Sequence, residues 1–362
     1  MRMRYFVGVT LFLLSLPLYA VQVEGLYSAK VAVDDQSQGA RNRAMGAAIN
    51  KVVQKVSGRQ SVLGNAALQD VLSNAGSYVE QFLYKKRDKE ELGYWLIVRF
   101  QKIALDRTLQ QFNVPVWGSN RPAVLVWLAV DDGKSRYLIN ADSEGMSELI
   151  RRSSSEAGLT VTLPLNDLAD QQALSFNDVW AGFSDEVLTA SQRYEKKQVM
   201  YGRLLKRGRG SWSLSWTLAN VTGQSIANIE QSSSIGAVIQ EAFAGIAETL
   251  ADTYAPHGAV TENVLKMDVN GVASLEKFVR VTAYLSSLDM VKKLHWNQLS
   301  NGKVTLEIVL SGGASTLKDV IALNTVLIPD FQPVPIIATP TVITPNKMGY
   351  HLAVQTLYYR TN

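Results

Sequence analysis

Two short charged clusters contain the residues whose types and spacing could do chemistry. Asp131 and Asp132 follow an apolar run, and paired carboxylates at the end of a strand can bind a metal ion or act as acid and base. The densest basic cluster of the chain lies on a predicted hairpin and consists of Arg203, Lys206, Arg207 and Arg209. Such a cluster could contact anionic lipid, glycan or an acidic protein. Each cluster also has a structural explanation, because aspartates suit turns and helix caps, and charges protect exposed strand edges.

Other residue patterns offer no recognisable catalytic, metal or cofactor site. His257, His295 and His351 lie in different local settings, without a second histidine or a carboxylate at ligand spacing. Gly208 and Gly210 have the spacing of a phosphate loop, but they lie between two predicted strands, where no helix amino terminus could bind phosphate. No serine lies in a GxSxG elbow. We therefore predict that the protein is not an enzyme and has no cofactor.

The first twenty residues have the pattern of a secretory signal peptide. Arg2 and Arg4 precede the uncharged apolar run 5–16, and Ala20 is a small residue at the predicted cleavage site. The run is short for a membrane span, so an uncleaved anchor is the alternative. The chain has no cysteine, which fits an oxidising compartment. We expect export to the periplasm with cleavage after Ala20.

Composition narrows the class of protein. The formal charge of the 362 residues is +4, and it falls to +2 when the two leader arginines are removed. A nucleic-acid binder usually has a larger, clustered basic excess, so we expect no nucleic-acid partner. Hydrophobic residues make up 47% of the chain, which is enough for packed cores, but no later stretch is long enough to span a membrane. The length predicts two or three domains.

The periodicity predicts an α+β fold of three small domains. Residues 21–113 alternate strands and helices. A first helix places Met45, Ile49, Val52 and Val56 on one face and ends at Gly58, and a second helix has an expected buried stripe of Leu68, Leu72, Val79 and Phe82. A strand at 94–100 and a short helix complete this domain. Residues 114–122, VPVWGSNRP, have the composition of a linker.

The pattern of residues 120–257 predicts a middle domain in which a sheet is flanked by helices. The apolar run 123–130 suits a strand covered on both faces. The stretch 199–231 alternates apolar and polar residues and reverses at RGRG and NVTGQ, which predicts three antiparallel strands, with Trp212 and Trp216 on one face. A helix is expected over 235–254. Asp131 and Asp132 lie beyond a strand, where ligands of open α/β sheets bind.

Residues 263–328 predict a ferredoxin-like βαββα domain. Its first helix follows Ser274, with Leu275 and four later apolar residues inward, and its second helix is expected over 315–327. The dipeptide Asn301-Gly302 predicts a tight hairpin. The Pro-rich tail, 329–362, is expected to be extended and to add an edge strand at its end.

Several of these segments resemble a proteobacterial envelope family that is classed only as a domain of unknown function. The matching motifs are VEGLYSAKV, AMGAAINKVVQKVSG, VLVWLAVDDG, YGRLLKRGRGSWSLSWTLANVTGQ and VNGVASLEKFVRVTAYLSSLDMVKKL. More distantly, the first helix is similar to the amino-terminal domain of a flagellar assembly protein of the outer basal-body ring. The hairpin is similar to amino-terminal domains of the Tol translocation protein and the curli secretion lipoprotein. These relatives bind proteins in the periplasm, although the lipobox cysteine and propeller repeats are missing here.

The sequence therefore predicts a periplasmic protein-interaction or assembly module of the cell envelope. We expect an unidentified envelope protein as its partner, contacted through exposed sheet edges and through the basic cluster. We expect no transmembrane span once the signal is removed. The alternative is a binder of small molecules or glycans, with its ligand at the mouth of the middle sheet near Asp131 and Asp132.

Overall fold

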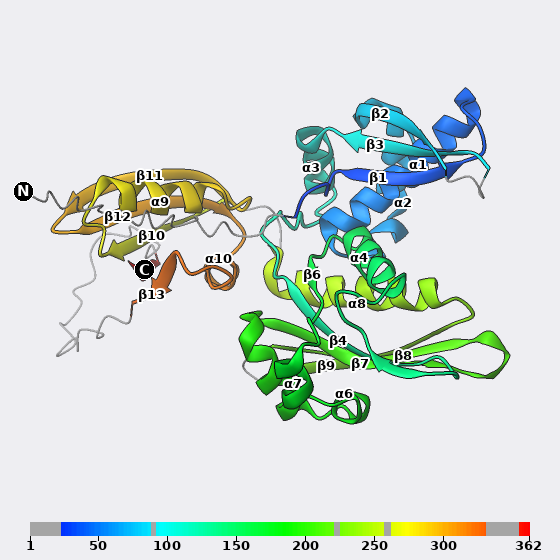
Figure 1. Ribbon diagram of the computed structural model, residues 1–362. Helices are drawn as coiled ribbons and strands as arrows, with labels where there is room; N and C mark the ends of the chain where they lie inside the picture. Colours follow the sequence, from blue (N-terminus) through cyan, green and yellow to red (C-terminus); the bar gives the residue numbers. More distant parts are fainter. Residues whose placement is uncertain (1–22, 88–91, 221–224, 257–261, 331–354) are drawn as a thin grey trace, which may run out of the picture.

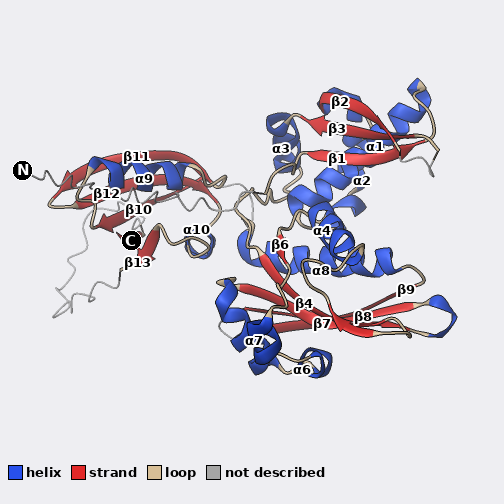
Figure 2. Cartoon of the chain, viewed as in Figure 1, coloured by secondary structure: helices blue, strands red, loops and turns tan. Residues whose placement is uncertain are grey.

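The computed structural model describes residues 23–87, 92–220, 225–256, 262–330 and 355–362 (Figure 1). In these residues the strands form three separate sheets, each with its own helices (Figure 2). The fold is therefore α+β and multi-domain, as predicted. The predicted signal peptide, His257, His351 and most of the Pro-rich tail lie outside the described residues.

The N-terminal unit is a small antiparallel sheet packed against helices. Its elements are β1 (Ser28–Val33), α1 (Gln38–Ser57), α2 (Ala66–Leu72), β2 (Val79–Lys86), β3 (Tyr94–Phe100) and α3 (Lys102–Gln111), with single 3-10 turns at Ser61–Gly64 and Ala75–Tyr78. The strand order is β1-β3-β2. The Ser37 hydroxyl caps α1 by accepting a hydrogen bond from the Ala40 amide, and Gly58 ends α1 with a φ of 70°. The predicted inward stripe of α1 is buried.

The second predicted helix is too long. Helix α2 ends at Leu72, and the remainder of its expected stripe, Val79 and Phe82, belongs to strand β2, where Phe82 is 41% exposed. Residues 79–86 pair with β3, Phe82 opposite Val98. A neighbouring strand therefore outweighs the helical spacing of the apolar residues, because pairing supplies backbone hydrogen bonds that a local pattern does not reveal.

The middle unit is a mixed sheet with helices on both faces. Its strands are β4 (Val124–Asp131), β5 (Arg136–Leu138), β6 (Val161–Thr162), β7 (Gln198–Lys206), β8 (Trp212–Asn220) and β9 (Ser225–Ser232). Its helices are α4 (Met146–Glu156), α5 (Leu168–Ala173), α6 (Phe176–Ala181), α7 (Ser184–Ser191) and α8 (Ile235–Tyr254), with 3-10 turns at Gln192–Tyr194 and Gly208–Gly210. The order is β5-β4-β7-β8-β9, with β6 beside β4. We call the face under α4 and α8 the inner face and the face under α5–α7 the outer face (Figure 1).

Two predictions for the middle sheet are confirmed. Strand β4 is buried from Val124 to Val130, as expected for a strand covered on both faces. The predicted three-strand run is β7, β8 and β9, paired in continuous antiparallel register. Trp212 and Trp216 both pack on the inner-face core, so they share one face of β8.

The C-terminal unit has the predicted βαββα order but a different sheet. Its elements are β10 (Glu262–Asn270), α9 (Leu275–Ser286), β11 (Val291–Ser300), β12 (Lys303–Ser311), α10 (Ala314–Ile321), β13 (Leu327–Pro329) and β14 (Thr356–Thr361), in the sheet order β11-β12-β10-β14-β13. Asn301 and Gly302 have φ values of 52° and 73°, so the predicted hairpin between β11 and β12 is confirmed.

The tail does not add an edge strand. Strand β14 lies between β10 and β13, parallel to β10 and antiparallel to β13. It is held inside the sheet because Leu357 and Tyr359 alternate into the core, each 4% exposed. The insertion moves β13 to the edge, so the sheet departs from a plain ferredoxin-like arrangement.

Two helix predictions in this unit need correction. Leu275, expected inward, is 77% exposed at the start of α9. Helix α10 ends at Ile321, and Leu327, expected at its end, begins β13. The chain from 327 to 329 pairs with β14, a partner that local periodicity cannot reveal.

The three units meet at residues 114–121, which are packed rather than free. Val114, Trp117 and Arg121 are buried. The Trp117 amide donates to the Val56 carbonyl at 2.8 Å, and the Arg121 guanidinium donates to three main-chain carbonyls. The predicted linker is therefore part of a packed, hydrogen-bonded junction.

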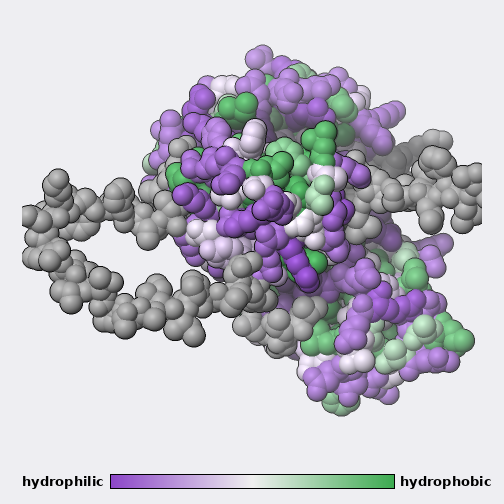
Figure 3. Space-filling view, turned by 90° about the vertical axis from the view of Figure 1, so that its left-hand side faces the viewer, coloured by the Kyte–Doolittle hydropathy of each residue, from purple (hydrophilic) through white to green (hydrophobic). Residues whose placement is uncertain are grey.

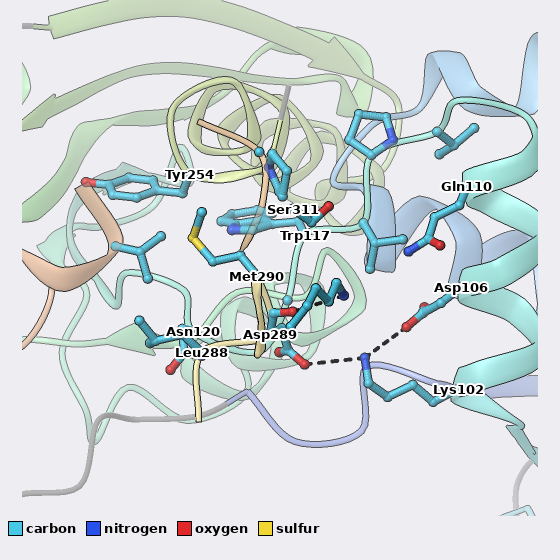
Figure 4. A pocket seen from close by; sticks show the side chains of 18 of the residues that line it. Lys102, Asp106, Gln110, Trp117, Asn120, Tyr254, Leu288, Asp289, Met290 and Ser311 are labelled. Atoms are coloured by element: carbon cyan, nitrogen blue, oxygen red, sulfur yellow. Dashed lines mark hydrogen bonds and ion pairs between the residues drawn. The ribbon is translucent and has the colours of Figure 1, made fainter. Parts of the chain in front are cut away.

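Asp289 connects the C-terminal unit to this junction. Its carboxylate accepts hydrogen bonds from the Ser119 amide at 2.6 Å and hydroxyl at 2.9 Å. It also pairs with Lys102 at 3.4 Å (Figure 4). Lys102 also pairs with Asp106 at 3.0 Å. Lys102, Asp106 and Asp289 border a cavity of about 60 Å³ between the units. Burial acts to raise the pKa of Asp289, but its contacts with Ser119 and Lys102 outweigh burial and place the pKa below its ordinary value.

Among the helices of the described residues, none combines the length and the apolar character that crossing a membrane requires.

Candidate functional site

The two charged clusters predicted from the sequence lie at the same end of the middle sheet. Strands β4 and β7 are parallel neighbours, and Asp131 pairs with Leu205. The acidic pair at the carboxyl end of β4 therefore lies beside the basic end of β7. The pKa of Asp132 is lowered chiefly by hydrogen bonds from the Ser135 and Lys134 amides, and the charge of Lys206 adds a smaller contribution.

Asp131 and Asp132 form the turn between β4 and β5. Asp131 accepts hydrogen bonds from the Gly133 amide at 3.0 Å and from Arg136 Nε at 2.8 Å, and these contacts lower its pKa. Asp132 accepts from the amides of Ser135 and Lys134, both at 2.8 Å, which lower its pKa as well. The aspartates thus have the turn geometry expected for their structural role. A ligand mouth at these residues stays a prediction.

The basic cluster spreads from the outer face to the hairpin turn. Arg203 lies on the outer face, its guanidinium 5.9 Å from the ring centroid of Trp180 in α6. Lys206 lies 5.8 Å from the Trp212 ring at the end of β7. Arg207 is exposed where the chain turns, and Arg209 belongs to the 3-10 turn Gly208–Gly210.

Trp180 is a site residue that sequence reasoning did not single out. Its ring faces Arg203 and also Arg136, whose guanidinium is likewise 5.9 Å from the centroid. It also stacks on Phe176 at 5.4 Å. Cations over an aromatic face are attracted by its quadrupole. The only local signal was an aromatic residue on a short helix, because the two arginines come from β5 and β7.

An open groove runs over the outer face beside Trp180. Its volume is about 510 Å³, and it is bordered by α6 and by the outer faces of β7, β8 and β9. Arg203 of β7 pairs with Ser215 of β8, and Ser215 pairs with Ile229 of β9, so these three side chains form one row across the floor of the groove. Helices α5–α7 cover the sheet up to this groove, whereas Ile229 is 59% exposed.

Among the described edge strands of at least 6 residues, which are β1, β2, β9 and β11, strand β9 is the one that carries no lysine; β1 carries Lys30. The edge strands β2 and β11 each carry two consecutive lysines and a break in register. In contrast, β9 pairs with β8 without a break over its 8 residues, and its one charged residue is Glu230. Lysines and bulges are the usual devices that prevent a free edge from pairing with another chain. Strand β9 lacks them and borders the groove.

The described residues contain no group of three or more Asp, Glu or His side chains placed to hold a metal ion. His295 lies in strand β11, opposite Glu307.

Comparison with known families finds a match to part of the chain. A model described as a domain of unknown function (DUF8605) matches residues 20–118, the segment that contains the first sheet and its helices. No curated protein matches the chain.

Proposed function

We propose that the chain is exported to the periplasm and acts there as a non-catalytic interaction or assembly module of the cell envelope. In this role it takes an extended segment of a partner protein as an additional strand beside β9. The observation that carries the proposal is the contrast between the unprotected edge of β9 and the lysine-bearing, bulged edges of β2 and β11.

The floor of the groove indicates the chemistry of the added strand. An antiparallel or parallel neighbour of β9 would place every second side chain on the outer face. The residue of the added strand that pairs with Ile229 would extend the row formed by Arg203, Ser215 and Ile229. Because its side chain would lie directly beside the Ile229 side chain, an apolar residue suits that position.

The partner is expected to carry acidic residues at one end of this strand. The carboxyl end of β9 lies on the same side as the basic end of β7, because Lys206, Trp212 and Ser232 form one row across the sheet. Exposed positive charge at that end favours the approach and the orientation of an acidic segment.

The predicted signal peptide supports a periplasmic location. The domain match begins at Ala20, the last residue of the predicted leader. The chain has no cysteine that the periplasm could oxidise.

Site-specific photocrosslinking in intact cells tests the proposal. A photoreactive amino acid at Ile229 is expected to capture one discrete envelope protein. The matched control is Ile103, an apolar residue on α3 that is 75% exposed. Capture that is equal at the two positions would contradict the proposal.

Variants then test the strand and the charges separately. Ala227→Lys introduces the missing protective lysine on β9, and we expect capture from Ile229 to be lost. Charge reversal in Arg207→Glu with Arg209→Glu is expected to weaken capture. Unchanged capture in the reversed variant would remove the hairpin turn from the site, whereas unchanged capture with Ala227→Lys would contradict strand addition.

A further inference from the structure

Helix α9 of the C-terminal unit turns an apolar row of side chains to solvent. Leu275, Val279 and Ala283 are spaced four residues apart, so they form one row along the helix. Leu275 is 77% exposed and Val279 is 53% exposed. The side of α9 that packs on the sheet uses other residues, of which Val281 and Leu285 are buried. The exposed row is therefore not needed to build this unit.

An aromatic pair extends the row toward β11. Trp296 is 63% exposed and meets the Phe278 ring edge-on, with 6.3 Å between the ring centroids. Figure 3 looks onto the end of the molecule where the C-terminal unit lies and shows apolar surface among the polar side chains there. A contiguous apolar surface on a folded protein marks an interaction site more often than a scattered apolar residue does.

Two opposite charges border the other side of the row. At about 100° per residue, Glu276 and Arg280 lie on the flank of α9 opposite to Phe278. They are four residues apart, so they follow each other along that flank.

The row is self-complementary for an antiparallel contact between two α9 helices. With a two-fold axis at Val279, Val279 meets Val279 of the second copy, and Leu275 lies over Ala283 of the second copy. A large side chain thus meets a small one twice, as interdigitating helices require. The same axis keeps equivalent flanks on the same side, so Glu276 of each copy lies beside Arg280 of the other.

We propose that two copies of this chain associate through α9, antiparallel about a two-fold axis at Val279. The occupant of the apolar row is a second copy, because both the sizes and the charges match those of the same helix reversed. The contact is one helix of about 18 Å with an aromatic border, so it forms a reversible dimer and not an obligate one. This inference does not rest on the strand-addition proposal. If both hold, each dimer carries two β9 edges.

Sedimentation velocity over a range of concentrations tests the dimer. The chain without its leader is expected to show a monomer–dimer equilibrium. Val279→Arg places two like charges on the axis, and it is expected to raise the dissociation constant at least about tenfold. Leu168→Arg, at a 70% exposed leucine of α5, is the matched control and is expected to leave the equilibrium unchanged.

A charge exchange tests the geometry itself. Glu276→Arg and Arg280→Glu each place like charges together, so each alone is expected to weaken the dimer. The double variant restores opposite charges and is expected to recover the affinity of the unaltered chain. A chain that stays monomeric at every concentration would overturn the proposal, as would a dimer whose affinity is indifferent to Val279→Arg or is not recovered by the double exchange.

Discussion

At the residue scale, Asp170 shows how one buried group supports the wall of the groove. Its carboxylate is 1% exposed and accepts hydrogen bonds from Arg193 at 2.8 Å, from the Tyr194 hydroxyl and from the Asn166 amide at 2.8 Å. These partners come from both ends of the α5–α7 segment. Because a buried carboxylate is tolerated only when it is well paired, this network holds the segment that presents Trp180.

Replacing the Asp170 carboxylate by an amide is expected to destabilise the protein. Asp170→Asn turns an acceptor into a donor that faces Arg193, which should lower the free energy of unfolding by about 2–3 kcal/mol. Urea denaturation of the middle unit measures this loss. The matched change at the exposed Asp142, Asp142→Asn, should cost less than about 0.5 kcal/mol. Equal losses in the two variants would show that the network contributes nothing.

Only some of the site residues could be predicted from the sequence. Arg203, Lys206, Asp131 and Asp132 were selected by charge and by position after predicted strands, which local pattern supplies. That the two clusters lie side by side depends on the parallel pairing of β4 with β7, which no local pattern encodes. Trp180 was missed as a site residue for the same reason.

At the element scale, β14 is the clearest case of long-range control. A strand of 6 residues at the end of the chain occupies the interior of a sheet whose other strands are formed at least 27 positions earlier. The alternation of Leu357 and Tyr359 correctly indicated a strand. Its place between β10 and β13 follows from which core it fills, so an edge position was the wrong expectation.

Deleting residues 355–362 is expected to open the C-terminal sheet. The deletion removes two side chains that are each 4% exposed, and burying such a side chain contributes about 1.5–3 kcal/mol. Amide hydrogen exchange should become faster in β10 and β13, while exchange in β7 and β8 stays unchanged. Unaltered protection of β10 would contradict the assigned role of β14.

The other element-scale lesson concerns helix and strand boundaries. Strong periodicity predicted α1, α8 and the β7–β9 run well, because each carries many apolar residues in one pattern. The errors at Phe82 and Leu327 share a cause. In both places a short apolar segment fits a helical spacing, but an antiparallel neighbour supplies the hydrogen bonds that decide its structure.

At the scale of the whole molecule, a small set of polar contacts fixes the three units relative to one another. Asp289 is central, because it joins the C-terminal unit to Ser119 of the junction and to Lys102 of the N-terminal unit. The arrangement of the three units therefore determines the relative positions of the β9 edge and the apolar row of α9.

Acid is expected to loosen this junction. The pKa of Asp289 is lower in the folded chain than its ordinary value of about 3.9. Its contribution to stability is therefore fully present above that ordinary value and is lost as the pH falls through the folded pKa. The protection of the amides at 114–121, relative to the intrinsic exchange rate at each pH, should fall over that acidic range in the unaltered chain. Asp289→Asn should show the faster exchange already at neutral pH, and a neutral-pH exchange rate equal to that of the unaltered chain would contradict the role of Asp289.

The central claim is that β9 receives a strand from an envelope partner, and amide hydrogen exchange along Ser225–Ser232 tests it most directly. The measurement compares the chain alone with the chain bound to the protein captured from Ile229. Strand addition predicts that every second amide of β9, those that point away from β8, becomes protected on binding. Protection elsewhere on the molecule with β9 unchanged would contradict the account.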